Sequence, residues 1–400
     1  MVEIIRQTFI SLFLSSIVIY IGQGILYEST WYTKLSGIYL LLFNLFCSFC
    51  VIQRKQHSIL FAVILAFAGW VFFLWLISVK GYTVLGEKVS TFSMVQHIVI
   101  VVTSLFSFYY ISNGGHFKKI VLMAFTMIIA ALYVYNILHF DVTTLGEGEF
   151  NFASANNKAY SLVALFPFLL LFWNKKWLMI ILMVASLVFI VFCLKRGAML
   201  CIAAYLIVTF YMIIKLNKRR HKYQLLTKII IAIIIGAFVY AFIDTYNENE
   251  FLQKRFDHGS EGREAIYTKI FTGIVNSNLL EMVIGHGPLS TVTVAGNYAH
   301  NDWLEVIYDF GIPGIILFVL IPVAMFRFYK RYTLEEELAG ILICVLYIVL
   351  RSSFSMCIYE LDSLLTFGYM GYIIGNHKYN FSKNLKILKR NEQNKAVVSC

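Results

Sequence analysis

Apolar runs of about 18 or more residues recur along almost the whole chain. A helix of that length crosses the hydrocarbon core of a bilayer. Inside lipid, every backbone amide and carbonyl must be hydrogen-bonded within the protein, which an α-helix achieves in one segment. Hydrophobic residues make up 60% of the 400 residues and charged residues 14%, a composition that a soluble domain cannot bury. The sequence therefore predicts an all-α, polytopic integral membrane protein.

The chain contains twelve candidate transmembrane spans, each predicted as one helix. Their approximate ranges are 7–26, 35–53, 58–79, 94–112, 120–139, 159–174, 177–194, 198–215, 226–244, 303–326, 337–356 and 361–376. The ranges at 159–174 and 361–376 are short for a bilayer crossing, so the count is eleven or twelve.

Positive charge in the connecting loops sets the predicted orientation. With the N-terminus in the cytoplasm, 22 of the 33 Lys and Arg residues fall on the cytoplasmic side, as expected for short cytoplasmic loops. Every alternate loop agrees, which supports an even number of spans and two cytoplasmic termini. The net charge of +11 is therefore attributed to topology and not to nucleic-acid binding. We expect a single transmembrane domain at 1–376 and a basic cytoplasmic tail at 377–400.

Two predicted external loops are longer than the others. Residues 140–158 are polar, and residues 245–302 form a much longer segment within the transmembrane domain. Loops above about 15 residues are usually functional or disordered. In the longer loop, apolar pairs repeat every four residues from Ile266 to Val275. This period predicts an amphipathic helix on the membrane or over the spans, with a small structural cap as the alternative.

A first group of external cations is Lys195-Arg196-Gly197, which interrupts two apolar runs and predicts a tight turn. Positive charge on the external side departs from the loop pattern. These cations either reach lipid phosphates or form an anion site facing a protein cavity. Arg351 is also external but lies outside this and the other motifs, so we expect it to matter less.

Arg263 opens the predicted amphipathic helix, directly after Gly259-Ser260-Glu261-Gly262. A helix N-terminus already favours anions through its free amides, and an arginine there adds bidentate hydrogen bonding to phosphate. The alternative is an ordinary ion pair of Arg263 with Glu261 or Glu264.

A polar stripe leads into the span at 303–326. His300 stands just before the span, and Asn301, Glu305 and Asp309 recur every four residues, so these three lie on one helix face. Polar groups at a membrane boundary are costly unless they are paired or functional. A neutral imidazole, with an ordinary pKa of about 6.5, is a suitable general base for a sugar hydroxyl. An ordinary interface histidine is the alternative.

Asn156 and Asn157 precede the predicted sixth span. Their amides either bind sugar hydroxyls or cap the helix. Several enzyme classes find no support, because the sequence has no P-loop, no G-x-S-x-G turn and no H-E-x-x-H zinc motif. The external acids form no obvious D-x-D metal pair, so we expect no metal and no cofactor.

Five motifs occur in a fixed order: the Asn156-Asn157 segment, Arg196-Gly197-Ala198 after a span, Arg263 opening a loop helix, Gly285-x-Gly287 followed by His300-Asn301, and Gly311-Ile312-Pro313-Gly314. In this order they resemble the O-antigen ligase and O-antigen polymerase (Wzy-type) superfamily of bacterial membrane enzymes. The motifs cover about residues 150–325, and the number of spans and the order of the loops fit along the whole chain.

The resemblance implies a metal-independent glycosyltransferase at the outer face of the bacterial cytoplasmic (inner) membrane. Its donor would be a glycan carried on undecaprenyl pyrophosphate. By the resemblance, Arg196 and Arg263 hold the donor pyrophosphate and His300 activates the acceptor hydroxyl. Substrate-binding roles are expected for Asn156, Asn157, Lys195, Asn301 and Glu305.

Three activities remain open under this resemblance. A polymerase joins lipid-linked repeat units of O-antigen or capsular polysaccharide, and it is favoured because residues 300–305 look like surface-polysaccharide polymerases. A ligase would pass the glycan to the lipid A core. A polyprenyl-linked glycan transporter would show internal repeats and helices broken at mid-bilayer, and no half-to-half repeat is present. The expected partners are the lipid-linked donor and acceptor, the bilayer, a chain-length regulator and a flippase.

Overall fold

The computed structural model describes most of the chain. The described residues are 2–22, 31–54, 58–78, 81–84, 87–117, 119–138, 152–193, 195–217 and 261–398, with the single residues 236, 240, 243 and 247. The predicted span at 226–244 lies outside the described residues except for three of these single positions. Residues 140–151 of the predicted loop at 140–158 also lie outside them, as do residues 245–260 of the predicted loop at 245–302, apart from residue 247.

Eight of the described helices are long and apolar enough to cross a membrane. They are α1 (Val2–Gly22), α2 (Trp31–Gln53), α3 (Ile59–Ile77), α4 (Thr91–Asn113), α5 (Lys119–Leu138), α8 (Arg196–Asn217), α14 (Asp302–Tyr329) and α15 (Glu335–Phe354). Three further helices fall on predicted spans: α6 (Phe152–Leu169, continued by the 3-10 turn η2, Leu170–Phe172), α7 (Lys176–Phe192) and α16 (Ser363–Val398). Each predicted span within the described residues thus coincides with a helix, while the total of twelve stays a prediction.

Two features add to the predicted helical architecture. A two-stranded antiparallel hairpin, β1 (Gly81–Val84) and β2 (Glu87–Ser90), connects α3 to α4. Helix α16 runs as one helix through residue 376, where the sequence predicts the border between the membrane domain and the basic tail.

The centre of the bundle is formed by α4 and α16, which pack side by side. Glycines of α16 face α4 at this contact. A Cβ at Gly371 would collide with the carbonyl of Leu105, and a Cβ at Gly375 would lie 2.6 Å from the carbonyl of Tyr109. Small residues allow membrane helices to approach with backbones in contact. This close pair is the axis around which α2, α3, α6 and α15 are packed.

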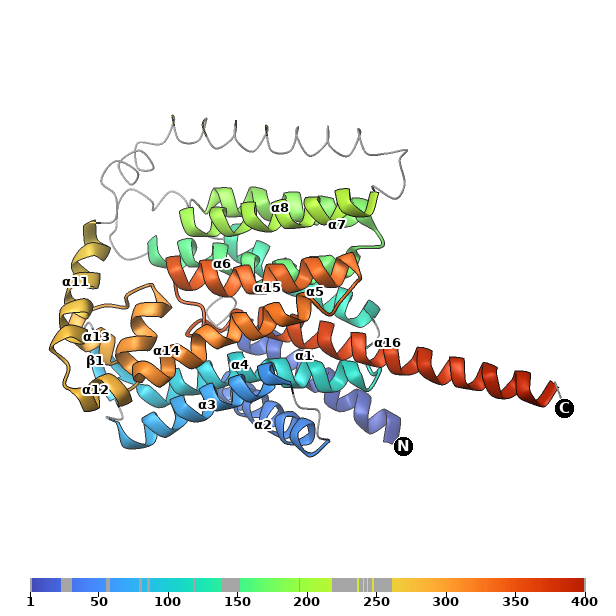
Figure 1. Cartoon of the computed structure of the whole chain (residues 1–400). Helices are drawn as coiled ribbons and strands as arrows, with labels where there is room; N and C mark the ends of the chain where they lie inside the picture. The colour runs from blue at the N-terminus through green and yellow to red at the C-terminus, as the bar shows by residue number, and fades with distance from the viewer. Residues whose placement is uncertain are drawn as a thin grey trace.

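Three short helices, α11 (Glu261–Asn276), α12 (Leu279–Ile284) and α13 (Ser290–Ala295), gather at one end of the bundle, called the α11 end here. The N-terminus and the C-terminal end of α16 lie at the opposite end (Figure 1). Helix α11 carries the predicted apolar period. Its Ile270 is fully buried and packs with Tyr308 of α14, so this helix lies over the spans.

The charge pattern and this arrangement together predict the membrane orientation. Reporter fusions after Asn249 and after Cys400, two positions outside the described residues, are expected to report opposite sides, with Asn249 external. A third fusion at Gly296, in the turn after α13, is expected to agree with Asn249. The reason is that basic residues concentrate at the end that carries the termini. If Asn249 and Cys400 report the same side, the orientation is wrong.

Candidate active site

The start of α14 is fixed by its own N-cap. Asn301 has an extended backbone, and its Oδ1 accepts the N–H groups of Trp303 and Leu304 at 3.1 and 3.3 Å. An asparagine in this position stabilises a helix by about 1 kcal/mol relative to alanine. The side-chain oxygen of Asn301 thus caps the helix. Its expected role in substrate binding stays a prediction.

Acids on one face of α14 are buried and bind the backbone of neighbouring loops. Asp302, Glu305 and Asp309 are 0, 2 and 1% exposed. Asp302 accepts the backbone N–H groups of Cys357 and Ile358 at 2.6 and 3.3 Å, which holds the loop between α15 and α16 against α14. Because both amides are buried and need an acceptor, these hydrogen bonds fix the path of the loop.

Asp309 does the same for the loop that leads into α13. It accepts the N–H groups of Leu289 and Thr291 at 3.0 and 2.8 Å, and the hydroxyl of Ser290 at 2.8 Å. The predicted polar residues therefore do lie on one face of α14. Its acids bind protein backbone, so the stripe organises the loops around the α11 end.

His300 is half-buried just before α14, and its backbone is held by Glu305. The Oε1 of Glu305 accepts the N–H groups of Ala299 and His300 at 2.6 and 3.2 Å. Burial, together with the nearby Arg263 and Lys195, lowers the pKa of the His300 imidazole to about 4. The imidazole is thus neutral at pH 7 and able to accept a proton.

Arg263 joins this group from the first turn of α11. Its Nη1 donates a hydrogen bond to the backbone carbonyl of Phe354 at 3.2 Å. Phe354 is the last residue of α15, so the bond docks the start of α11 on the end of α15. Arg263 is half-buried, and it acts on His300 through its charge.

The turn from α7 to α8 brings the second cation. A Cβ at Gly197 would collide with the hydroxyl of Tyr160 and lie 2.8 Å from Cβ of Phe354. Only glycine therefore lets α8 start against both α6 and α15. Lys195 places its Nζ 5.7 Å from the ring centroid of Tyr160 and acts on His300, whereas the side chain of Arg196 is exposed. The charge of Lys195 therefore acts on His300, and the predicted role of Arg196 in holding the pyrophosphate stays a prediction.

Arg351, which lies outside the motifs, is buried next to Tyr160 and Tyr347. It is 1% exposed on α15, its guanidinium donates to the hydroxyl of Tyr347, and its Cζ lies 5.0 Å from the ring centroid of Tyr160. In the part of the chain that the structure describes, no hydrogen-bond partner reaches its Nε. The sequence does contain one indication of its importance, namely an arginine within the apolar run 337–356. Buried charges in membrane spans are rare and usually functional.

Glu360 supplies a carboxyl beside these cations, in the loop between α15 and α16. Burial raises the pKa of Glu360, while Arg351, Lys158 and Lys195 act in the opposite direction. This acid is half-buried, and no periodicity in the sequence marks it. The loop that carries it is the one bound by Asp302.

Asn156 and Asn157 lie inside α6, in its second turn. Helix α6 begins at Phe152, before the predicted sixth span, so the alternative prediction that these residues cap the helix is wrong. Their expected role in binding sugar hydroxyls stays a prediction.

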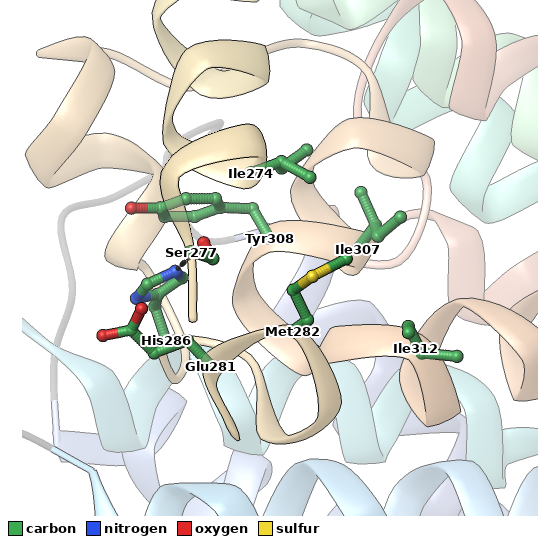
Figure 2. Close-up of a pocket in the computed structure, with 8 residues that line it drawn as sticks. All are labelled: Ile274, Ser277, Glu281, Met282, His286, Ile307, Tyr308 and Ile312. Atoms are coloured by element: carbon green, nitrogen blue, oxygen red, sulfur yellow. Dashed lines mark hydrogen bonds between the residues drawn. The ribbon is translucent and has the colours of Figure 1, made fainter. Parts of the chain in front are cut away.

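A second histidine lies in a separate pocket between α11, α12 and α14 (Figure 2). His286 stacks on Tyr308, with ring centroids 4.3 Å apart, and its Nε2 lies 2.9 Å from Oγ of Ser277. That hydroxyl donates its hydrogen to the carbonyl of Gly273 at 2.8 Å. The imidazole is therefore the donor to Ser277, and the pair lacks the geometry of an activated serine nucleophile.

The elements of the site come from distant parts of the chain: Tyr160 of α6, Lys195 before α8, Arg263 of α11, His300 before α14 and Arg351 of α15. Together they combine positive charge with a neutral imidazole in a partly buried place. Such a site suits an anionic group next to a hydroxyl that must lose its proton. Within the described ranges, no group of three or more His, Cys, Asp or Glu side chains is placed to hold a metal ion.

Comparison with known proteins agrees with the motifs. A family model described as O-antigen ligase matches residues 181–319, from within α7 to within α14. The match confirms the superfamily resemblance, and it includes Lys195, Arg263 and His300 but not Arg351. No curated protein matches the chain significantly.

Proposed function

Since the chain belongs to the O-antigen ligase and polymerase superfamily, we propose that it polymerises oligosaccharide repeat units carried on undecaprenyl pyrophosphate. The reaction is a metal-independent glycosyl transfer with inversion, at the external face of the bacterial cytoplasmic membrane. The donor is one lipid-linked glycan, and the acceptor is a sugar hydroxyl on another.

The observation that carries this proposal is a half-buried His300 whose imidazole pKa is lowered by burial and by the charges of Arg263 and Lys195. A glycosyl diphosphate has a good leaving group, which needs charge stabilisation more than protonation. A guanidinium and an ammonium group near the diphosphate stabilise the negative charge that develops as it leaves. A neutral histidine then serves as the base for the acceptor.

The transfer proceeds as one displacement. The acceptor hydroxyl oxygen forms a bond to the anomeric carbon while the bond from that carbon to the diphosphate oxygen breaks. The electron pair of the broken bond leaves with undecaprenyl diphosphate, next to Arg263 and Lys195. The hydroxyl proton passes to His300. Because the base and the leaving group act on opposite faces of the sugar, the configuration at the anomeric carbon inverts.

The choice of polymerase over ligase rests on residues 300–305, which resemble surface-polysaccharide polymerases. The test gives the purified protein two acceptors in separate reactions, namely lipid-linked repeat units alone, and repeat units with lipid A core. We expect a ladder of longer lipid-linked chains from repeat units alone. Transfer only in the presence of lipid A core would identify a ligase. Movement of the lipid-linked glycan across proteoliposome membranes without any transfer would identify a transporter.

A further inference from the structure

Glu305 makes a contact that its predicted role in substrate binding does not require. Its Oε1 accepts two consecutive backbone N–H groups, from Ala299 at 2.6 Å and from His300 at 3.2 Å. The side chain is 2% exposed and projects from the first turn of α14. Two consecutive backbone amides that donate to one buried carboxyl oxygen leave that segment of the chain little freedom, so Glu305 fixes the backbone that carries the imidazole.

The backbone conformation of His300 is one that its surroundings must stabilise. Its φ is 52°, in the left-handed region that residues other than glycine rarely adopt. A non-glycine residue keeps this conformation only when its surroundings impose it, and such residues concentrate at functional sites. The two amides that donate to Glu305 belong to the residue directly before His300 and to His300 itself. These bonds therefore act on the strained backbone directly.

We propose that Glu305 is a positioning residue that acts through His300, holding the imidazole at the place where it meets the acceptor hydroxyl. The proposal rests on the proposed function of His300 as the base. It departs from the expectation that Glu305 touches the sugar. Asp309 provides a matched control on the same helix face, because it binds backbone amides of a different loop, at Leu289 and Thr291.

The first test is a double-mutant cycle in the elongation assay. Glu305→Ala is expected to lower kcat by about 100-fold, the effect of a misplacement near 1 Å, with little change in KM for the donor. Glu305→Gln keeps an oxygen acceptor and is expected to recover most of the rate. In a His300→Ala background, Glu305→Ala is expected to lower kcat no further. Asp309→Asn is expected to lower kcat by the same factor in both backgrounds. Equal losses from Glu305→Ala in both backgrounds would overturn the proposal.

The second test does not depend on activity. Diethyl pyrocarbonate modifies neutral imidazoles, and mass spectrometry of the peptide that contains residue 300 gives the rate at His300. We expect faster modification in Glu305→Ala than in wild type, and an unchanged rate in Asp309→Asn. If the rates differ in this way but wild type forms no polymer, the proposed function fails and the positioning role stands. Equal rates in Glu305→Ala and wild type would refute the positioning role itself.

Discussion

Replacing His300 by alanine is expected to lower turnover by about 10²–10⁴-fold, the usual contribution of a general base. The KM for the lipid-linked donor is expected to change little, because Arg263 and Lys195 remain to hold the diphosphate. His286→Ala is the matched control, since this histidine lies at the same end of the bundle in a separate pocket. Its loss is expected to cost less than about tenfold. Steady-state elongation of purified lipid-linked repeat units measures both variants.

The pH dependence gives the same hypothesis a second measurement. A base must be unprotonated, so activity falls as the pH drops through its pKa. Burial and the charges of Arg263 and Lys195 lower the pKa of His300 to about 4, so kcat/KM is expected to fall only near that pH. A bound diphosphate neutralises the two cations, so the pKa rises in the complex and the fall in kcat begins at a higher pH. An identical acid limb in His300→Ala would show that another group titrates.

Replacing Arg263 by lysine is expected to lower kcat/KM by about 10–100-fold, the equivalent of one hydrogen bond to a charged group. Lysine keeps the positive charge but loses the planar fork that binds phosphate with two parallel bonds. The substitution also replaces the guanidinium that donates a hydrogen bond to the Phe354 carbonyl. That hydrogen bond docks α11 on α15. The same elongation assay, run over a range of donor concentrations, measures the loss.

Lys269→Gln is the control for Arg263, because Lys269 is exposed on the same helix. Its activity is expected to stay at the wild-type level. The buried position of Arg351 makes it unsuitable for this purpose, contrary to the expectation from its place outside the motifs. Wild-type kinetics in Arg263→Lys would mean that the guanidinium does not bind the donor.

The helices could be predicted from the sequence because each depends on a local property. Long apolar runs mark spans whatever their neighbours are, so ranges such as 120–139 and 303–326 reappear almost unchanged as α5 and α14. The end of α16 could not be placed in this way. Residues 377–398 are polar, and hydropathy separates a polar segment from a span without saying whether the helix continues.

The residues of the site could likewise be predicted only where a local motif marks them. Arg263 and His300 stand in recognisable motifs, so their types and order suffice to select them. Arg351 and Glu360 have no motif, and only the packing of α15 and its following loop against α6 and α8 brings them near Lys195.

The roles of Asn301 and Glu305 were the hardest to predict. A period of four places Asn301, Glu305 and Asp309 on one face, but it does not say what that face meets. The structure shows Asn301 capping α14, and it shows Glu305 and Asp309 binding backbone amides of two loops. Those bonds depend on the path of loops 289–291 and 299–300, which no local pattern of side chains encodes.

The most direct measurement is elongation of purified lipid-linked repeat units by wild type and His300→Ala in one buffer that contains a metal chelator. The anomeric configuration of the new linkage is determined by NMR on the wild-type product. We predict that wild type elongates the chains with inverted configuration, and that His300→Ala binds the donor but forms almost no product. Wild-type rates in His300→Ala, retained configuration, or loss of wild-type activity caused by the chelator would each contradict a metal-independent displacement with His300 as the base.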